Sequence, residues 1–575
     1  APSRAQVLQS SICPAMESRG HSKGSQASVE LNVYLEPELL RGVSLNEALS
    51  GCGRHWKTPD SGMYTVDPAH YQLSKEIEGY DAFLSHDWAS SGLLKLLSLL
   101  IVFNSGPAFF ACLAISIAAG FLRGYKVIPD GPWGTSVAAS YVAFALVFLF
   151  WQRIRSLMCR PLMVFLDKLC IAQHDEEMKQ RGIISLPGFL LSSRKLVVLW
   201  TPRYFSRLWC TFEIATFLKD AGNERRIQFM PLKTSGILAL SAASWMPVLL
   251  IFHFAIQWQE ENAGNTSAAL LGMAGMMSIV ACVILPVVNY MGLGLLKDLQ
   301  ELPKQLGEFR VQEAQCFCCS HDHRHPHTGD RIRCDRRLVF KSLRKWYGPG
   351  QEGEAYLDHF NARVANELAP NLVSGMGSNS LPFSYTMYVV GACYVPYLSN
   401  YIVDFVQMSQ QGLPGDELLL WSLRNLSMWA MMWLLPVYST AASMFVFKYG
   451  LFLQQKCFSS YRPFYAQLLA SLLLMPCGWS SVGVAWTIFG VAVAYSDSRS
   501  LLPVIPLFVI VGVTLYLFGL FRPSQWLCRR GASAGIDTSE EAVCSSHSKI
   551  MTSTSDKELR NTAHDADFEV ETFEV

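Results

Sequence analysis

The chain contains eight apolar segments that are long enough, or nearly long enough, to cross a lipid bilayer as helices. A helix needs about 20 apolar residues to span a hydrocarbon core of about 30 Å, and its backbone groups must pair within the helix because lipid offers them no partner. The segments are residues 105–122, 136–151, 236–258, 268–296, 383–406, 418–446, 464–494 and 501–521. They predict a polytopic α-helical membrane protein whose first partner is the lipid bilayer.

The composition agrees with a membrane protein. Hydrophobic residues make up 51% of the chain and charged residues 16%, which is low for a soluble domain. The formal net charge of +1 gives no reason to expect nucleic acid as a partner. His253, Asp404 and Arg424 fall inside predicted spans, but they do not form the series of charges that a proton relay or a voltage sensor needs. A channel or transporter is therefore an alternative without positive support.

Basic residues near the ends of the spans predict the orientation of the chain, because loops rich in lysine and arginine stay in the cytosol. Such residues gather at 153–160, 324–345, 448–462 and 522–530, which lie on one side of the membrane if all eight segments cross it. Both termini are then cytosolic. A glycosylation sequon at Asn265 falls on the opposite side, in agreement with this topology. No feature of the sequence selects one cellular membrane.

Four short apolar runs outside the spans predict a β-sheet. They are residues 82–84, 162–166, 196–200 and 227–230. Runs that are apolar on both faces are typical of central strands in a parallel sheet, and helices predicted at 186–191 and 209–219 give the alternation of a doubly wound fold. A transmembrane hairpin at 105–153 falls between the first two strands. The α/β domain therefore consists of two parts, residues 76–104 and 154–233.

The rest of the chain divides by composition. We expect a disordered N-terminal segment at 1–75, transmembrane helices 3 and 4 at 234–296, a cytosolic Cys/His-rich helical segment at 297–382, transmembrane helices 5 to 8 at 383–522 and a disordered acidic tail at 523–575. The chain ends in Phe573-Glu574-Val575, which fits a PDZ groove as an added strand. A PDZ domain is therefore a candidate partner.

Ligands of doubly wound sheets bind beyond the carboxyl ends of the strands. The residues that we expect to bind a cofactor or ligand there are Ser85, His86, Asp167, Lys168 and Trp209. Glu213, one helical turn after Trp209, is the candidate catalytic residue, because a carboxylate at this edge serves as a base or binds a sugar hydroxyl. The alternative is that Glu213 is an exposed charge at the edge of a helix.

Several of these residues resemble the Toll/interleukin receptor (TIR) domain family. Residues 80–85 are similar to the first-strand box of the family, 164–167 to its second strand and 168–183 to its BB loop. Thr201, Tyr204, Ser206, Trp209, Cys210 and Glu213 are similar to its Ser-x-x-Tyr-x-x-Ser-x-Trp-Cys-x-x-Glu pattern, with a threonine in place of the first serine. The resemblance covers most of one domain.

The resemblance implies a flavodoxin-like fold and a signalling module that self-associates. It also implies an alternative function, since some TIR domains hydrolyse NAD with a glutamate at the position of Glu213. One departure bears on both functions, because the family has a soluble helix where this chain has a membrane hairpin. We expect an α-helical polytopic membrane protein with a cytosolic, flavodoxin-like TIR-like domain split by that hairpin. Its function is signalling or protein association, with NAD hydrolysis and a regulated channel or transporter as alternatives.

A cytosolic tract rich in cysteine and histidine follows the fourth predicted span. Thiolates and imidazoles are the ligands that zinc prefers, and four of them suffice for a tetrahedral site. The candidate ligands are Cys316, Cys318, Cys319, His321 and Cys334, and His323, His325 and His327 lie among them. The spacing matches no standard zinc finger, because a single residue separates the first two cysteines. A reduced polar loop and palmitoylated cysteines near the membrane are the alternatives.

Overall fold

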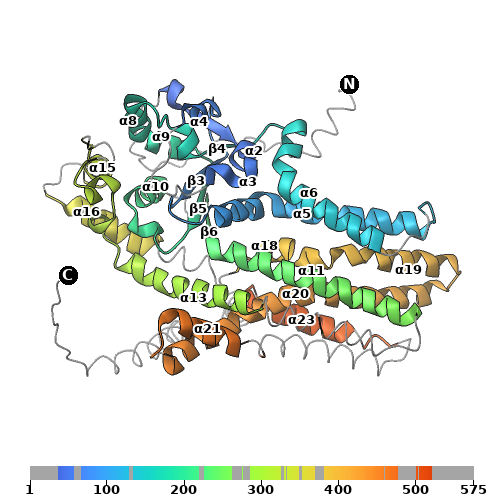
Figure 1. Ribbon diagram of the computed structural model, residues 1–575. Coiled ribbons are helices and arrows are strands. Elements are labelled where there is room, and N and C mark those ends of the chain that lie inside the picture. Colours follow the sequence, from blue (N-terminus) through green and yellow to red (C-terminus); the bar gives the residue numbers. More distant parts are fainter. Residues whose placement is uncertain are drawn as a thin grey trace, which may run out of the picture. The chain divides into compact units, whose positions relative to one another are not determined.

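The computed structural model describes residues 36–56, 67–128, 134–218, 226–261, 275, 285–324, 329, 331, 333–348, 353–368, 381–458, 460–474, 476, 500–502 and 504–520. The chain divides into two units, Ala1–Phe518 and Gly519–Val575. All of the helices and strands that the structure describes lie in the first unit (Figure 1). The predicted tail at 523–575 with its PDZ-type ending, and the sequon at Asn265, fall outside the described residues.

A six-stranded sheet lies at the centre of the α/β part. Its strands are β1 (Arg41–Ser44), β2 (Lys75–Glu76), β3 (Ala82–His86), β4 (Met163–Phe165), β5 (Leu196–Trp200) and β6 (Ile227–Pro231). They are ordered β2-β1-β4-β3-β5-β6, the last four mutually parallel and β1 antiparallel to both of its neighbours. The four predicted strands are confirmed. Their spatial order of second, first, third and fourth is that of flavodoxin-like sheets.

Strands β3 and β4 are neighbours although two long helices separate them along the chain. Ala82 pairs with Val164 and Phe83 with Phe165, and the two phenylalanine rings stack with their centroids 4.5 Å apart. All four side chains are buried, and each large apolar side chain contributes about 2 kcal/mol by leaving water. The predicted assembly of one sheet from two separated parts of the chain is therefore confirmed.

Part of the segment 1–75 is folded, so the prediction that it is disordered is wrong for residues 36–56 and 67–75. There β1 pairs with β4, and the buried Trp56 donates a hydrogen bond of 2.7 Å from Nε1 to the carbonyl of Ala48. Three short helices, α2 (Leu45–Ala48), α3 (Ser50–Gly53) and α4 (Pro68–Gln72), accompany the two strands. Strands of two and four residues are too short to show a readable alternation of apolar and polar residues.

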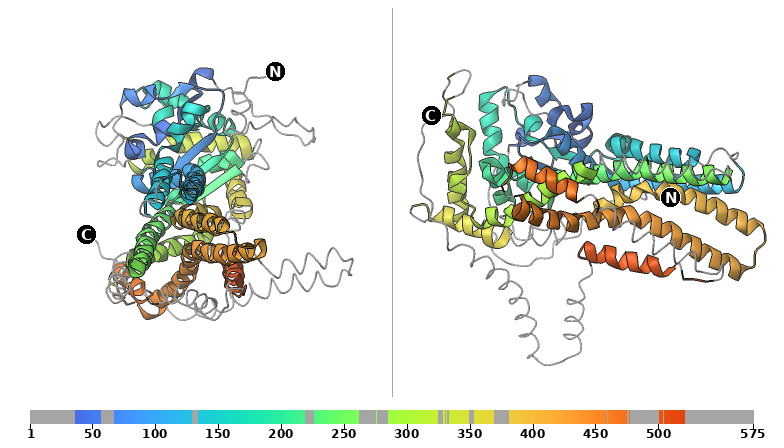
Figure 2. Two further views of the ribbon diagram at one scale, coloured as in Figure 1. Left: turned by 90° about the vertical axis from the view of Figure 1, so that its right-hand side faces the viewer. Right: turned by 60° about the horizontal axis from the view of Figure 1, so that its bottom comes forward.

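Helices cover the sheet and extend beyond it (Figure 2). They include α5 (Gly92–Gly124), α6 (Gly134–Met158), α7 (Asp167–Cys170), α8 (Glu176–Ile184), α9 (Leu186–Leu191), α10 (Leu208–Leu218), α11 (Leu232–Glu261), α13 (Leu285–Gly307), α14 (Phe317–Ser320), α15 (Asp335–Tyr347), α16 (Ala355–Arg363), α18 (Phe383–Val389), α19 (Leu398–Gln410), α20 (Gly415–Cys457), α21 (Pro463–Leu473) and α23 (Val504–Leu517). The predicted helices at 186–191 and 209–219 correspond to α9 and α10.

Several of the described helices are long and apolar enough to cross a membrane, which indicates an integral membrane protein. They are α5, α6, residues Leu232–Phe254 of α11, and α20, with the bent pair Phe383–Cys393 and Val395–Gln410 as a fifth candidate. These match five of the eight predicted spans. Of the other three, 268–296 and 464–494 lie partly outside the described residues, and the apolar helix in 501–521, α23, has only 14 residues.

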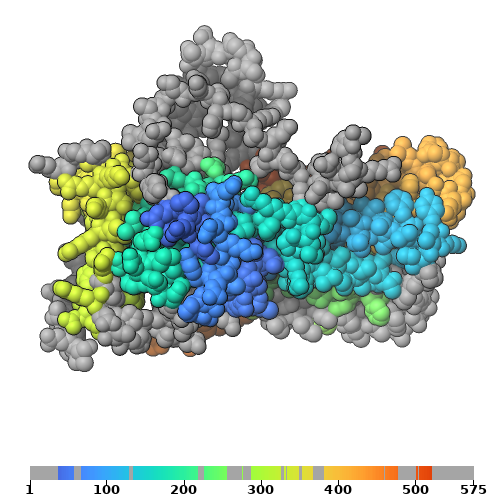
Figure 3. Space-filling model, turned by 90° about the horizontal axis from the view of Figure 1, so that it is seen from above, coloured from blue at the N-terminus to red at the C-terminus, as the bar shows by residue number. Residues whose placement is uncertain are grey.

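The amino edge of the sheet faces the apolar helices. Helix α5 follows β3 and runs back past Lys195, just before β5, whose Nζ lies 4.4 Å from the ring centroid of Phe103. Helix α6 leads back to the same edge, where Arg160 forms an ion pair of 3.7 Å with Asp81, just before β3. In Figure 3 the blue and teal segments of the α/β part border the cyan α5 and α6. The carboxyl edge of the sheet therefore faces away from the apolar helices.

Candidate functional site

Ser85 connects the carboxyl end of β3 to helix α10. Its hydroxyl donates a hydrogen bond to Oε2 of Glu213 and shares a second one with the phenolic hydroxyl of Tyr204. The three side chains are buried, and only 8% of the Glu213 surface is exposed. The sequence pattern therefore places Ser85 and Glu213 correctly at one edge of the sheet. The alternative of an exposed charge at a helix edge is wrong.

Burial determines the protonation state of this cluster. It raises the pKa of Glu213 to about 8, against the opposing effect of the hydrogen bond from Ser85. Burial also raises the pKa of Tyr204 well above its ordinary value. At neutral pH Glu213 is therefore mainly a neutral carboxylic acid, and the cluster has the character of a hydrogen-bonded core group.

Asp167 and Lys168, at the carboxyl end of β4, form a second cluster with Trp88. The indole Nε1 of Trp88 donates a 2.5 Å hydrogen bond to Oδ2 of Asp167, and the Lys168 ammonium lies 5.0 Å from the Trp88 ring centroid. Burial raises the pKa of Asp167 and lowers that of Lys168, and in each case the other residue of the pair opposes the shift. Each charge thus offsets part of the desolvation cost of the other.

His86 is the last residue of β3, directly after Ser85. Its ring meets that of Trp56 edge to face at 5.1 Å, and Cys210 Sγ donates a weak hydrogen bond of 3.6 Å to its carbonyl oxygen. Burial, with a further effect of nearby lysines led by Lys95, holds the pKa of His86 well below its ordinary value. The ring is therefore neutral, and its Nε2 has no hydrogen-bond partner among the described residues.

Two residues that the sequence analysis did not select complete this edge. Asp87, 1% exposed at its side chain, lies 3.1 Å from a guanidinium nitrogen of Arg207. Trp88 holds Asp167, as described above, and its carbonyl oxygen accepts a 3.2 Å hydrogen bond from Lys95. The signal that would have found them is their position directly after β3, where ligands bind in doubly wound folds.

Trp209 does not join the residues with which it was predicted to bind a cofactor. Its Nε1 donates a hydrogen bond of 3.2 Å to Asp335, the first residue of α15. Phe212 on the same helix stacks on Trp346 of α15, with centroids 5.3 Å apart. This part of α10 therefore docks the Cys/His-rich segment rather than a ligand.

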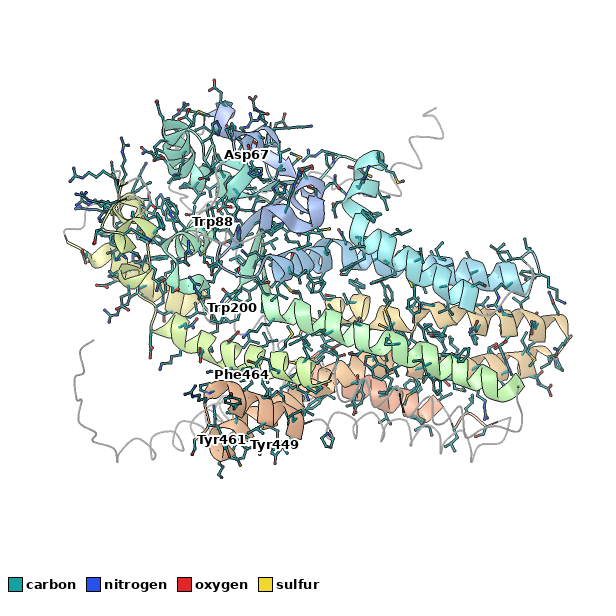
Figure 4. All side chains as sticks on the ribbon, viewed as in Figure 1. Asp67, Trp88, Trp200, Tyr449, Tyr461 and Phe464 are labelled. Carbon is teal, nitrogen blue, oxygen red and sulfur yellow. The ribbon has the colours of Figure 1, made fainter. Side chains whose placement is uncertain are left out.

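A cavity of about 100 Å³ lies at the carboxyl edge. Its lining comes from the ends of β5 and β6, from the starts of α5 and α11, and from α13. It consists of Ser90, Ser91, Leu94, Trp200, Thr201, Pro202, Pro231, Leu232, Lys233, Leu295 and Asp298. Trp200 and Trp88 are marked in Figure 4. Lys233 and Asp298 form an ion pair of 2.6 Å. Glu213 is not among the lining residues, and the cavity is smaller than the roughly 300 Å³ at which small-molecule sites begin.

The cysteines of the second candidate site lie together. The ligand atoms of Cys318, Cys319, His323 and Cys334 all lie within 4.8 Å of one another, and those of Cys316, Cys318 and Asp335 form an overlapping group. His321 was the predicted histidine, but its Nδ1 lies 2.9 Å from the carbonyl oxygen of Phe317 and it belongs to neither group. The structure therefore groups His323, rather than the predicted His321, with the cysteines. His325 and His327 lie outside the described residues.

Comparison of the chain with protein families, with curated proteins and with solved structures finds no match.

Proposed function

We propose that the protein is a membrane-anchored signalling protein whose α/β part is a cytosolic, TIR-like module that acts by associating with other proteins, including further copies of itself. The pairing of β3 with β4 across the membrane hairpin carries this proposal. It supports a doubly wound domain built from the same ordered boxes that resemble the TIR family. The buried bonds from Ser85 to Tyr204 and Glu213 give the residues of the Trp-Cys-x-x-Glu box an architectural role.

The connection between sheet and membrane supports signalling. Helix α5 rises about 50 Å at 1.5 Å per residue, so a span of about 30 Å leaves about 20 Å of the same helix beside the sheet. Helix α11 starts directly after β6, and Ser98 of α5 bonds Ser235 of α11 at 2.9 Å between their hydroxyl oxygens. A movement of these spans therefore moves the elements that carry the carboxyl edge.

Aromatic and basic side chains support the cytosolic orientation. Tyr449, Tyr461 and Phe464, marked in Figure 4, are more than half exposed at the end of α20 and the start of α21. Lys448, Lys456 and Arg462 accompany them in the sequence. Aromatic residues gather at the membrane interface, and lysine and arginine gather on its cytosolic side. The connection between α20 and α21 then lies in the cytosol, on the side of the membrane that we assign to the sheet.

Helix α8 is the surface through which we expect the α/β part to bind a second copy of the chain. It lies where the resemblance expects the BB loop, it begins with two exposed glutamates, and Ile184 at its end is 59% exposed. An exposed apolar residue within a polar rim is typical of an interface anchor. In pull-downs between two differently tagged full-length chains in detergent, Ile184→Arg should reduce recovery of the second chain about tenfold, a loss of about 1.4 kcal/mol.

The matched control is Leu93→Arg, because Leu93 is 73% exposed and lies on α5 rather than α8. This variant should associate like the wild-type chain. The proposal would be contradicted if Ile184→Arg recovered as much of the second chain as the wild type does, or if the wild-type chain did not associate.

NAD hydrolysis is the second candidate function. The pKa of Glu213, about 8, lies in the range that suits a general acid or base, which favours this function. Its burial and its absence from the cavity lining favour an architectural role. Incubation of the purified chain with NAD, beside Glu213→Gln, separates the two. Under the association proposal neither chain consumes NAD, whereas consumption by the wild-type chain alone would assign hydrolysis to Glu213.

A further inference from the structure

Four side chains of the Cys/His-rich segment have the separations of ligands around one small ion. The Sγ atom of Cys319 lies 3.9 Å from Sγ of Cys318, 3.8 Å from Sγ of Cys334 and 3.7 Å from Nε2 of His323. In a tetrahedral zinc site with Zn–S bonds of about 2.3 Å and Zn–N bonds of about 2.0 Å, two sulfurs lie about 3.8 Å apart and a sulfur and a nitrogen about 3.5 Å apart. The observed separations agree with these values.

We propose that Cys318, Cys319, His323 and Cys334 bind one zinc ion. Three thiolates and one imidazole form a complete tetrahedral set, which leaves no open position for a substrate and is typical of a structural site. The inference is independent of the function of the α/β part.

The backbone around these residues supports the proposal. Asp322 and His323 both have left-handed conformations, with φ of 49° and 58°, which are costly for residues other than glycine. The turn is held by a 2.7 Å hydrogen bond from the His323 amide to the Cys318 carbonyl, and it brings the imidazole to Cys319. A metal bond supplies the free energy that keeps such a turn in place.

Helix α15 contributes a second element to the site. It begins at Asp335, directly after Cys334, and the Asp335 amide donates a 3.3 Å hydrogen bond to Cys318 Sγ. The first turn of α15 therefore lies against the cluster and helps to fix the position of Cys318 Sγ.

Other fates of these cysteines fit the structure less well. The described thiols of the cluster are free, and none of the separations among the four proposed ligands is near the 2.0 Å of a disulfide. Cys316 and Cys318 are 3% and 0% exposed, so a palmitoylating enzyme cannot reach either thiol. Cys316 Sγ lies 3.0 Å from Cys318 Sγ, closer than two ligands of one zinc ion, which assigns Cys316 to the surroundings of the site.

The site connects the Cys/His-rich segment to the α/β part. Gln315, just before the first cysteines, exchanges backbone hydrogen bonds with the start of α10: its amide donates to Ser206 and its carbonyl accepts from Leu208. Trp209 bonds Asp335 from the same side. Zinc would therefore hold α14 and α15 against α10, the helix that carries Glu213.

The test is the metal content of the full chain, purified in detergent without chelators and measured by mass spectrometry of the elements. We expect one zinc per chain in the wild-type protein and a loss of at least about tenfold in Cys334→Ser and in His323→Asn, because even the loss of a residue that only supports a ligand weakens metal affinity about 10–100-fold. His321→Asn and Cys316→Ser are the matched controls, and both should keep their zinc.

A second measurement does not depend on the folding of any variant. Cobalt exchanged into the wild-type chain should give the visible absorption of tetrahedral Co²⁺ with thiolate charge-transfer bands. A wild-type chain without zinc, an octahedral cobalt spectrum, or loss of zinc in His321→Asn with retention in His323→Asn would each overturn the assignment.

Discussion

Glu213 illustrates how burial changes the meaning of a residue that a sequence pattern selects. The Trp-Cys-x-x-Glu box and the position of Ser85 at the end of a predicted strand predicted that Glu213 and Ser85 lie at the same edge of the sheet. In the structure a hydrogen bond joins the two side chains. Sequence could not reveal that the carboxyl group has so little exposed surface, because part of its cover comes from Ser85 of β3, 128 positions earlier in the chain. A carboxyl group in this setting is kept neutral at neutral pH.

The stability of the protein should therefore depend on pH through Glu213. The pKa of this group is raised from 4.5 to about 8 in the folded chain, so between these values the folded state holds a proton that the unfolded state has released. The free energy of unfolding then falls by up to about 1.4 kcal/mol per pH unit as the pH rises through this range. Glu213→Gln stays neutral and removes this slope.

Thermal unfolding of the full chain in detergent at pH about 5.5 and about 8 measures the effect. The midpoint of Glu213→Gln should rise relative to the wild-type midpoint as the pH increases. Glu177→Gln, which changes an exposed glutamate on α8, is the control and should follow the wild-type chain. Parallel curves for the wild-type chain and Glu213→Gln would contradict the burial of an ionisable carboxyl group at this position.

Trp209 and His323 show the limit of local patterns at the residue scale. The helical spacing of Trp209 and Glu213 predicted a shared face, yet the indole nitrogen bonds Asp335, which lies 126 positions further along the chain. The Cys/His tract predicted a metal site with His321, whereas the structure groups His323 with the cysteines. His323 rather than His321 lies beside the cysteines because Asp322 and His323 have left-handed backbone conformations, which the residue types do not predict.

At the scale of elements, hydropathy predicted which helices are apolar better than it predicted where they begin. The sequence predicted a span starting at residue 105, whereas α5 is one helix that starts at Gly92 and contains Pro107. Proline is tolerated in membrane helices because neighbouring groups satisfy the freed backbone carbonyl. Strands β3 to β6 were predictable because their sequences are runs of mainly apolar residues, whereas β1 and β2, with four and two residues, are too short to show a pattern.

Close packing of α5 against α19 provides a test at this scale. A Cβ atom added at Gly120 would lie 2.8 Å from Cβ of Ile402 and 3.0 Å from the carbonyl oxygen of Ser399. Gly124, four residues later, meets Val406 in the same way, which is the small-residue spacing of tightly packed membrane helices. Gly120→Ala should therefore destabilise the protein by about 1–3 kcal/mol.

The control for this prediction is Gly512→Ala on the apolar helix α23, where an added Cβ atom meets nothing within 4 Å. This change should leave the thermal midpoint unchanged or raise it, since alanine favours helix by about 1 kcal/mol over glycine. If both variants melt alike, α5 and α19 are not packed as described.

At the scale of the whole molecule, the account joins a membrane part and a sheet through continuous helices. The amino edge of the sheet faces the apolar helices, so the carboxyl edge with Ser85, Asp167 and Glu213 is directed away from them. Sequence predicted both parts and the interruption of one by the other. It could not predict the direction of that edge, because the direction follows from contacts such as that of Phe103 with Lys195 and that of Asp81 with Arg160.

The central claim is that residues on either side of the membrane hairpin meet in one sheet on the cytosolic side. Asp81, before β3, and Arg160, before β4, are joined by an ion pair of 3.7 Å, and Arg160 is exposed enough for a reagent to reach it. The most direct measurement is the crosslinking of a chain carrying Asp81→Cys and Arg160→Cys with a short thiol-specific reagent that cannot cross membranes, added from the cytosolic side of intact vesicles. We predict an intramolecular crosslink between the two positions, absent from either single variant. A yield no higher than that of the single variants, or crosslinking only from the opposite side, would contradict the account.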